Sequence, residues 1–232
     1  MVTTLTQLDQ NGFVILPQFL SDGELGRLEQ ILPPVHPATG GLRNLLDIPP
    51  IAELAEGEHM RSLIHEALGR DAFPIRAILF DKTETANWKV SWHQDLTIAV
   101  RERRDMAGYG PWTSKQGVVH VQPPAAVLEQ TLAVRLHVDD SGAGNGPLRV
   151  LPGSHRAGKL RDEDIPAWQE RLSEEVCLVP RGGALVMRPL LLHASSPATE
   201  PRHRRVLHIE YASCELPAGL EWRWAKRSAR AA

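Results

Sequence analysis

The chain has 232 residues, of which 42% are hydrophobic and 23% are charged, a balance typical of folded globular proteins. Its formal net charge of −2 gives no electrostatic basis for binding nucleic acid. No stretch approaches the roughly 20 apolar residues of a membrane span, so neither nucleic acid nor a membrane is an expected partner.

The cysteines and the N-terminus indicate a cellular compartment. Cys177 and Cys214 are the only cysteines, and two isolated thiols provide no disulfide framework and suit a reducing environment. The first residues carry neither the basic start nor the apolar run of a signal peptide. We therefore expect a cytoplasmic protein.

The first quarter of the chain is predicted to be mainly helical. Ser21 followed by Glu24 is a capping box, and apolar residues then recur at helical spacing over 25–32. A second helix is predicted over 59–68, with Gly69 as its C-terminal stop. The segment between them, rich in Pro and Gly, is predicted to be a loop.

From residue 75 the pattern changes to short apolar runs separated by turn residues, which is typical of a β-sandwich or barrel. A helical insertion is predicted over 162–175. The predicted strands cover residues 75–80, 118–121, 131–138, 148–151, 184–187, 190–193 and 204–211.

This order of elements predicts a mainly β protein, a β-barrel buttressed on one face by N-terminal helices. We expect a single domain over 1–232, with a mainly helical buttress (1–72), a β-barrel core (73–215) and a tail (216–232). The basic residues near the C-terminus are predicted to be a solvated tail rather than a binding patch; they are Arg223, Lys226, Arg227 and Arg230.

Two predicted strands each have one apolar face and one polar face. In 131–138 the polar face includes Arg135 and His137, and in 204–211 it includes Arg204, His208 and Glu210. The apolar faces suit packing under the helices. The polar faces either line the interior around a charged ligand or are exposed to solvent, and the alternation alone does not choose between them.

Three residues form a potential metal site. His93 and Asp95 lie two apart in an extended segment, so both side chains can reach one ion, and His193 ends an apolar run. Two imidazoles and a carboxylate suit one face of Fe(II), with Zn(II) as the competing metal. The alternatives are a surface His–Asp pair and a buried His193 bonded to the backbone. No CxxC or HExxH pattern supports a separate zinc site.

Arg204 begins the strand that follows His193. A guanidinium binds a carboxylate bidentately and stays charged in an apolar cavity, so Arg204 could hold the far carboxylate of an organic co-substrate. Its neighbours Arg202, His203 and Arg205 fit a solvated basic loop equally well. Arg205 belongs to the opposite face of the strand, so only one of the two can point into a site.

Taken together, four segments resemble the phytanoyl-CoA dioxygenase family of Fe(II)- and 2-oxoglutarate-dependent oxygenases. Those oxygenases have a double-stranded β-helix (jelly-roll, cupin-like) fold. The segments, in the order of the family, are NGFVILPQFLSDGEL (11–25), WHQDLTIAV (92–100), GNGPLRVLPGSHRAGKL (144–160) and HASSP with RRVLHIEY (193–197 and 204–211).

The resemblance implies the chemistry and the residues that carry it. His93, Asp95 and His193 would ligate Fe(II), and Arg204 with Ser195 would bind the C5 carboxylate of 2-oxoglutarate. With dioxygen, such an enzyme hydroxylates an unactivated C–H bond of a small molecule and releases succinate and CO2. Because Asp95 is present, halogenation is disfavoured, since related halogenases lack this carboxylate.

Further residues are predicted around this site with alternatives left open. Segment 80–92 has no clear family equivalent, and co-substrate or substrate contacts or loop packing are predicted for Lys82, Asn87, Trp88 and Lys89. The basic side chains that could contact substrate or tune the iron are Arg135, His137 and His208. Three tryptophans form an apolar lid or pack under a loop: Trp88, Trp92 and Trp112. Segment 101–116 is predicted to be a mobile active-site loop, and His155 to be structural.

The chain also departs from the family. It has Ala198 where an Asn is frequent, and Gly144 where a Glu is common before Asn145 and Gly146. Neither position belongs to the metal triad. Two other classes remain: a catalytically silent binding protein, and a cupin-like zinc hydrolase or isomerase. The complete triad together with Arg204 favours the oxygenase, while the substrate and the oligomeric state are not predicted by the sequence.

Overall fold

The computed structural model describes residues 4–36 and 40–224. The α-helices are α1 (Thr4–Asn11), α2 (Asp22–Ile31), α3 (Pro49–Ala55), α4 (Glu58–Leu68), α5 (Ala125–Leu128) and α6 (Ile165–Arg171). The strands are β1 (Phe13–Leu16), β2 (Gly41–Leu42), β3 (Phe73–Lys82), β4 (Val90–His93), β5 (Ile98–Val100), β6 (Trp112–Lys115), β7 (Val118–Val121), β8 (Thr131–His137), β9 (Leu148–Val150), β10 (Glu175–Cys177), β11 (Ala184–Met187), β12 (His193–Ser195) and β13 (Arg204–Ala212). Within the described ranges, no helix is both long and apolar enough to cross a membrane.

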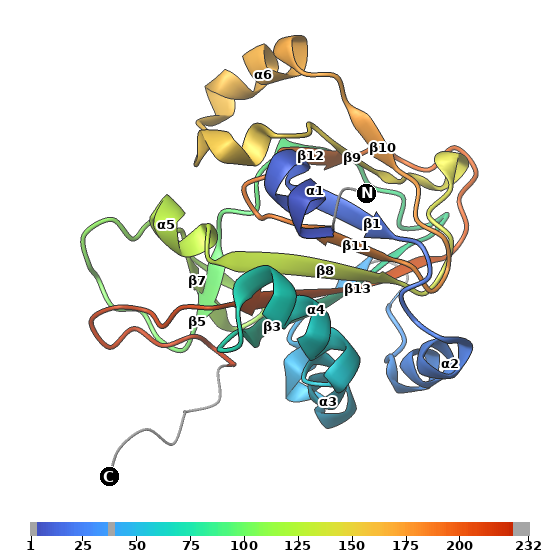
Figure 1. Cartoon of the computed structure of the whole chain (residues 1–232), viewed down its shortest axis with the longest axis horizontal. Coiled ribbons are helices and arrows are strands. Elements are labelled where there is room, and N and C mark those ends of the chain that lie inside the picture. The colour runs from blue at the N-terminus through green and yellow to red at the C-terminus, as the bar shows by residue number, and fades with distance from the viewer. Residues whose placement is uncertain (1–3, 37–39, 225–232) are drawn as a thin grey trace.

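Two antiparallel sheets form the body of the molecule. A six-stranded sheet has the order β1-β11-β8-β13-β3-β2, and a four-stranded sheet has the order β10-β9-β12-β4. In Figure 1 the six-stranded sheet crosses the middle of the view, with α2, α3 and α4 on one side and the smaller sheet with α6 on the other. This arrangement confirms the predicted jelly-roll with N-terminal helices against one face.

The outer face of the larger sheet is the apolar face predicted from the strand alternation. Leu132, Val134 and Leu136 of β8 and Leu207 and Ile209 of β13 are buried in the main core cluster. The helices supply the other half of that cluster, as the amphipathic pattern requires. Ser21 caps α2, with both hydrogen bonds of the capping box formed, and Gly69 follows the last residue of α4.

The space between the two sheets is divided into an apolar part and a polar part. Leu148 and Val150 of β9 pack there against Leu185 and Met187 of β11. The polar faces of β8 and β13 are also buried, so the interior interpretation of these faces is correct; the buried side chains are Arg135, His137, Arg204, His208 and Glu210. Buried charges on this scale need partners or a ligand.

A three-stranded sheet, β5-β7-β6, extends the molecule at one end. β6 and β7 form a hairpin whose two turn residues, Gln116 and Gly117, have φ of 50° and 78°, as a type I′ turn needs. Leu220 and Trp222 pack against this sheet, and Trp222 bridges to Val100. The predicted tail at 216–232 is therefore wrong for residues 216–224, because apolar contacts hold them. Lys226, Arg227 and Arg230 lie outside the described residues.

Some predicted boundaries also change. The predicted strand at 190–193 is wrong, because Leu191 N–H bonds to Arg188 O in a turn and β12 begins only at His193. The helical part of the predicted insertion ends at Arg171, and β10 follows it. Segment 101–116 contains β6, and the helical buttress contributes β1 and β2 to the larger sheet.

Candidate metal centre and the charged interior

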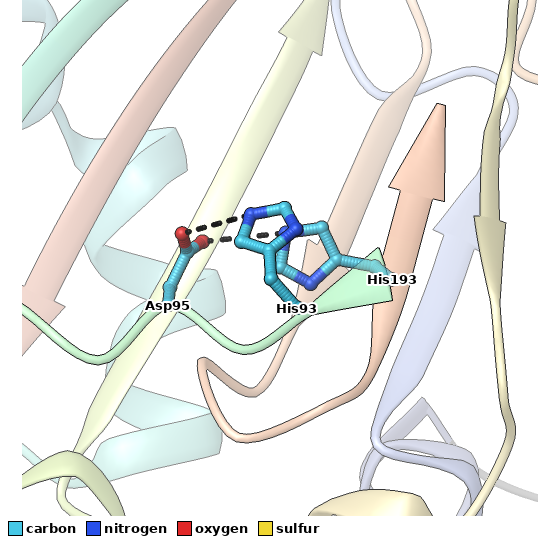
Figure 2. Close-up of side chains that lie close together, drawn as sticks. All are labelled: His93, Asp95 and His193. Atoms are coloured by element: carbon cyan, nitrogen blue, oxygen red, sulfur yellow. Dashed lines mark ion pairs between the residues drawn. The ribbon is translucent and has the colours of Figure 1, made fainter. Parts of the chain in front are cut away.

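Strand pairing brings His93 and His193 together. They face each other in the β4–β12 register, and their ring centroids lie 4.2 Å apart. Asp95 follows β4, where its N–H donates to Pro189 O at 2.9 Å. Figure 2 shows the carboxylate reaching both rings, with Oδ1 3.8 Å from His93 Nε2 and Oδ2 3.7 Å from His193 Nε2.

Backbone contacts fix which ring nitrogens are available. His93 Nδ1 lies 2.9 Å from Ser91 O, and His193 Nδ1 lies 2.8 Å from Leu191 O. A carbonyl only accepts, so each Nδ1 donates a proton, and each Nε2 faces Asp95. This is how proteins orient imidazole ligands of a metal.

The protonation states suit a cation. Burial lowers the pKa of His193 to about 4, so the ring is neutral at pH 7. Burial alone would raise the pKa of Asp95. The combined effect of His193, His208, His93 and Arg76 is larger and lowers this pKa below its usual value, so the carboxyl is ionised. Two imidazoles and a carboxylate, with atoms all within 4.8 Å of one another, fit Fe(II).

Gln94 holds this motif in place, a role that the sequence analysis missed. Its buried amide donates to Leu190 O at 2.6 Å and to Gly158 O at 2.8 Å, and accepts from Leu160 N at 2.8 Å. The side chain therefore ties the His-x-Asp segment to two loops. No sequence signal marks this role, because the loops meet only in the fold.

Arg204 and Lys82 face each other in the β13–β3 register and form a second buried group. Arg204 Nη1 donates to Gly146 O. Lys82 Nζ donates to Ser195 Oγ at 3.0 Å and to Ser196 O at 2.7 Å, and Ser195 Oγ donates to Gly146 O at 3.0 Å. Gly146 has φ +60°, and a Cβ there would lie 2.7 Å from Ser196 O and 3.0 Å from Lys82 Nζ.

No carboxylate pairs with Arg204 or Lys82 among residues 4–36 and 40–224. Burial, and then the charge of Arg204, lowers the pKa of Lys82 to about 8. Burial, and then Arg135, lowers the pKa of Arg204 to about 10. His137 nearby has neither ring nitrogen hydrogen-bonded within the described structure. We call Arg204, Lys82 and Ser195 the anion pocket, because it holds buried positive charge without a counter-ion.

A third group lies beside Asp95. Arg76 Nη2 donates to Glu210 Oε1, and His208 Nε2 lies 2.9 Å from the same oxygen. Arg135 Nη1 donates to His208 Nδ1 at 3.1 Å, so that nitrogen accepts and Nε2 carries the proton given to Glu210. Asp95, His208 and Glu210 also offer ligand atoms within 4.8 Å of one another. Since Arg76 already neutralises Glu210, this group is a closed ion-pair network.

The remaining predicted residues lie around these groups. Asn87 clamps a loop, with Nδ2 2.9 Å from Ala198 O and Oδ1 2.6 Å from Ala198 N, so its amide is engaged with the backbone. Trp88 packs on Gly40, and its ring lies 5.4 Å from Lys82 Nζ. Lys89 lines a groove beside α6 that His93 also lines.

Two of the predicted lid tryptophans have packing roles. Trp92 neighbours His93 in β4, so it points to the opposite face, where it packs with Leu151, Ile165 and Leu192. Of the two alternatives predicted for Trp92, packing fits this position, and a contact with substrate from the inner face does not. Trp112 packs into the cluster under β5–β7. His155 packs against Gly12, a structural position as predicted.

Comparison with known proteins supplies the family. The sequence model of the family described as "Phytanoyl-CoA dioxygenase (PhyH)" matches residues 8–206 of this chain. L-proline trans-4-hydroxylase from Streptomyces griseoviridis is 24% identical over 244 residues, which cover 87% of this chain and 82% of the hydroxylase.

Two solved structures share the fold. AviO1 from Streptomyces viridochromogenes Tue57 has a TM-score of 0.66 at 20% identity, covering 94% of this chain and 97% of AviO1. EctD from S. alaskensis with bound Fe has a TM-score of 0.67 at 18% identity, covering 89% of this chain and 74% of EctD. Because the family model spans most of the sequence, the chain belongs to the phytanoyl-CoA dioxygenase family of iron- and 2-oxoglutarate-dependent oxygenases.

Proposed function

We propose that the protein hydroxylates an unactivated C–H bond of a small molecule. In this reaction R–H, 2-oxoglutarate and dioxygen give R–OH, succinate and CO2. The proposal rests on one observation: a His–Asp–His group that could bind a metal lies in the same interior as the buried anion pocket. The L-proline hydroxylase supports a small-molecule substrate.

Each group has a separate role. His93, Asp95 and His193 hold Fe(II), which when bound supplies the activation of dioxygen. Arg204 and Lys82 neutralise the far carboxylate of 2-oxoglutarate, and Ser195 gives it a hydroxyl to bond. Arg135 and His208 belong to the hydrogen-bond network that ends at Glu210, and His208 also lowers the pKa of Asp95.

The burial of these groups is part of the function. Arg204 and Lys82 are 4% and 0% exposed, so a bound carboxylate meets fixed charges rather than water. The ionised Asp95 and the neutral His193 need no deprotonation before they accept the metal.

The test measures metal binding, 2-oxoglutarate binding and succinate release with Fe(II) and air. We expect His93→Ala to abolish iron binding and succinate release, and Arg204→Ala to weaken 2-oxoglutarate binding while iron still binds. Arg205→Ala is the matched control, because Arg205 points away and pairs with Asp139 at 2.7 Å.

The outcomes separate the classes. Zinc bound tightly without 2-oxoglutarate binding would favour the zinc hydrolase or isomerase, since these three ligands also suit Zn(II). Binding of both iron and 2-oxoglutarate with no succinate release under any substrate would favour the silent binding protein.

A further inference from the structure

Two basic side chains next to the metal site take no part in the roles assigned so far. Arg43 follows β2, and Lys115 ends β6. They come from different sheets, and both lie within electrostatic range of Asp95, Arg76 and Glu210. The metal ligands therefore have cations at this end of the interior as well as at the anion pocket.

The sheet register positions Arg43. Gly41 and Leu42 pair with Phe80 and Leu79 of β3, and continuing that register sets Arg43 opposite Ile78. Ile78 pairs with His208 on β13, the residue whose ring bonds to Glu210. Paired residues share a face of the sheet, so Arg43 belongs to the inner face that carries the metal-site network.

A tight hairpin positions Lys115. It pairs with Val118 across the two-residue turn of β6 and β7. Its Nζ donates to Thr97 Oγ1 at 3.4 Å, and Thr97 lies two residues after the metal ligand Asp95. The hairpin geometry and this contact hold the ammonium group beside the metal site.

The carboxylates of this region are already engaged. Asp95 faces the two metal-binding histidines, and Glu210 bonds to Arg76 and His208. No ion pair within the described chain includes Arg43 or Lys115. Burial and then Arg76 lower the pKa of both groups, and Arg43 adds to the effect on Lys115, as expected for crowded like charges. His120 nearby adds no charge, because burial lowers its pKa to about 4.

We propose that the substrate is a small carboxylic acid and that Arg43 and Lys115 bind its carboxylate. This inference rests on the proposed oxygenase function and names the class of molecule that it oxidises. A carboxylate between these two cations would relieve their mutual repulsion, and it matches the planar guanidinium of Arg43.

This site is distinct from the anion pocket. On β3, Lys82 pairs with Arg204, and the continued register sets Arg43 opposite Ile78. Four residues separate Lys82 from Ile78, which corresponds to ~13 Å along an extended strand. With the far carboxylate of 2-oxoglutarate held in the anion pocket, Arg43 and Lys115 can therefore bind a second anion.

The experiment uses the protein loaded with Fe(II) and saturating 2-oxoglutarate without oxygen, so that the anion pocket is filled. Titration calorimetry then compares small carboxylic acids (amino, hydroxy, aliphatic and aromatic) with their primary amides. We expect acids to bind and the matching amides to bind at least about tenfold more weakly, the loss expected for one charge-assisted hydrogen bond.

Variants assign the site. Arg43→Gln and Lys115→Gln should each weaken binding of the best acid about tenfold and leave its amide unaffected, with partial rescue in Arg43→Lys. Arg103→Gln is the control, because this exposed arginine pairs with Asp105 at 2.9 Å. Equal binding of acids and amides, acid binding that survives both variants, or no acid bound at all would overturn the proposal. If the wild-type protein did not bind 2-oxoglutarate, that result would instead contradict the proposed function.

Discussion

The inner face of β3 and β13 carries charge at both ends, but the two ends differ in how it is balanced. At one end, Arg76 and Glu210 form an ion pair that also includes His208. At the other end, Arg204 and Lys82 are both cations, bonded only to neutral oxygens among the described residues. Burial is similar at the two ends, so burial alone does not explain the contrast.

The difference separates structure from function. A buried pair such as Arg76–Glu210 balances its own charge, and losing one partner leaves the other without compensation. Buried cations without an anion destabilise the empty protein and become favourable only when a ligand supplies the charge. One end therefore stabilises the fold, and the other end suits the 2-oxoglutarate binding proposed above.

The largest expected effect comes from breaking the balanced end. Arg76→Met should lower the free energy of unfolding by about 3–5 kcal/mol, because it leaves the Glu210 carboxylate buried without its cation. Urea denaturation of the metal-free protein measures this change in the free energy of unfolding. Removing both charges, in Arg76→Met with Glu210→Met, should cost much less. Equal losses in the single and double variants would contradict this account.

The opposite end should respond in the opposite way. Arg204→Met removes an uncompensated buried cation, and Gly146 O keeps its bond from Ser195 Oγ, so the free protein should lose no stability. Its affinity for 2-oxoglutarate should fall about tenfold to a hundredfold, as expected for a hydrogen bond to a charged group. Denaturation and calorimetry on the same variant measure both values. A clear loss of stability with affinity retained would show that Arg204 is structural.

Local sequence patterns predicted much of this architecture. The predicted capping box at Ser21 and Glu24 is present in the structure. The alternation over 131–138 and 204–211 correctly distinguished the strand faces that pack against the helices from the faces that line the interior. The same alternation also places Trp92 on the face opposite His93, where its ring packs with Leu151, Ile165 and Leu192.

Other features depend on contacts between distant segments. Gln94 bonds to loops 64 to 96 residues away, and nothing in its neighbourhood marks this. Arg43 and Lys115 converge only through the register of β2 and the turn of β6–β7. A turn over Arg188–Leu191 stands where part of a strand was predicted, because the apolar run at 190–192 reflects burial, which a turn and a strand can share.

Lys82 makes the unbalanced end sensitive to pH. Its pKa is lowered from 10.5 to about 8 by burial and by Arg204, so between these values the unfolded chain holds a proton that the folded protein has lost. Stability of the ligand-free protein should therefore rise with pH across this window, and Lys82→Met should remove the rise. The affinity for 2-oxoglutarate should fall as pH increases through about 8, because the dianion needs the ammonium form. Denaturation and calorimetry at several pH values test both slopes, and slopes of the same sign would contradict the assignment.

Ser195 should give the smallest change, since its hydroxyl is neutral and shared. Ser195→Ala removes one acceptor from Lys82, which keeps Ser196 O at 2.7 Å, and one donor from Gly146 O, which keeps Arg204. With no buried group left unpaired, we expect stability to fall by about 1 kcal/mol or less and 2-oxoglutarate affinity to fall only severalfold. A loss as large as that of Arg204→Met would mean that the hydroxyl, rather than the two cations, determines how the pocket recognises its anion.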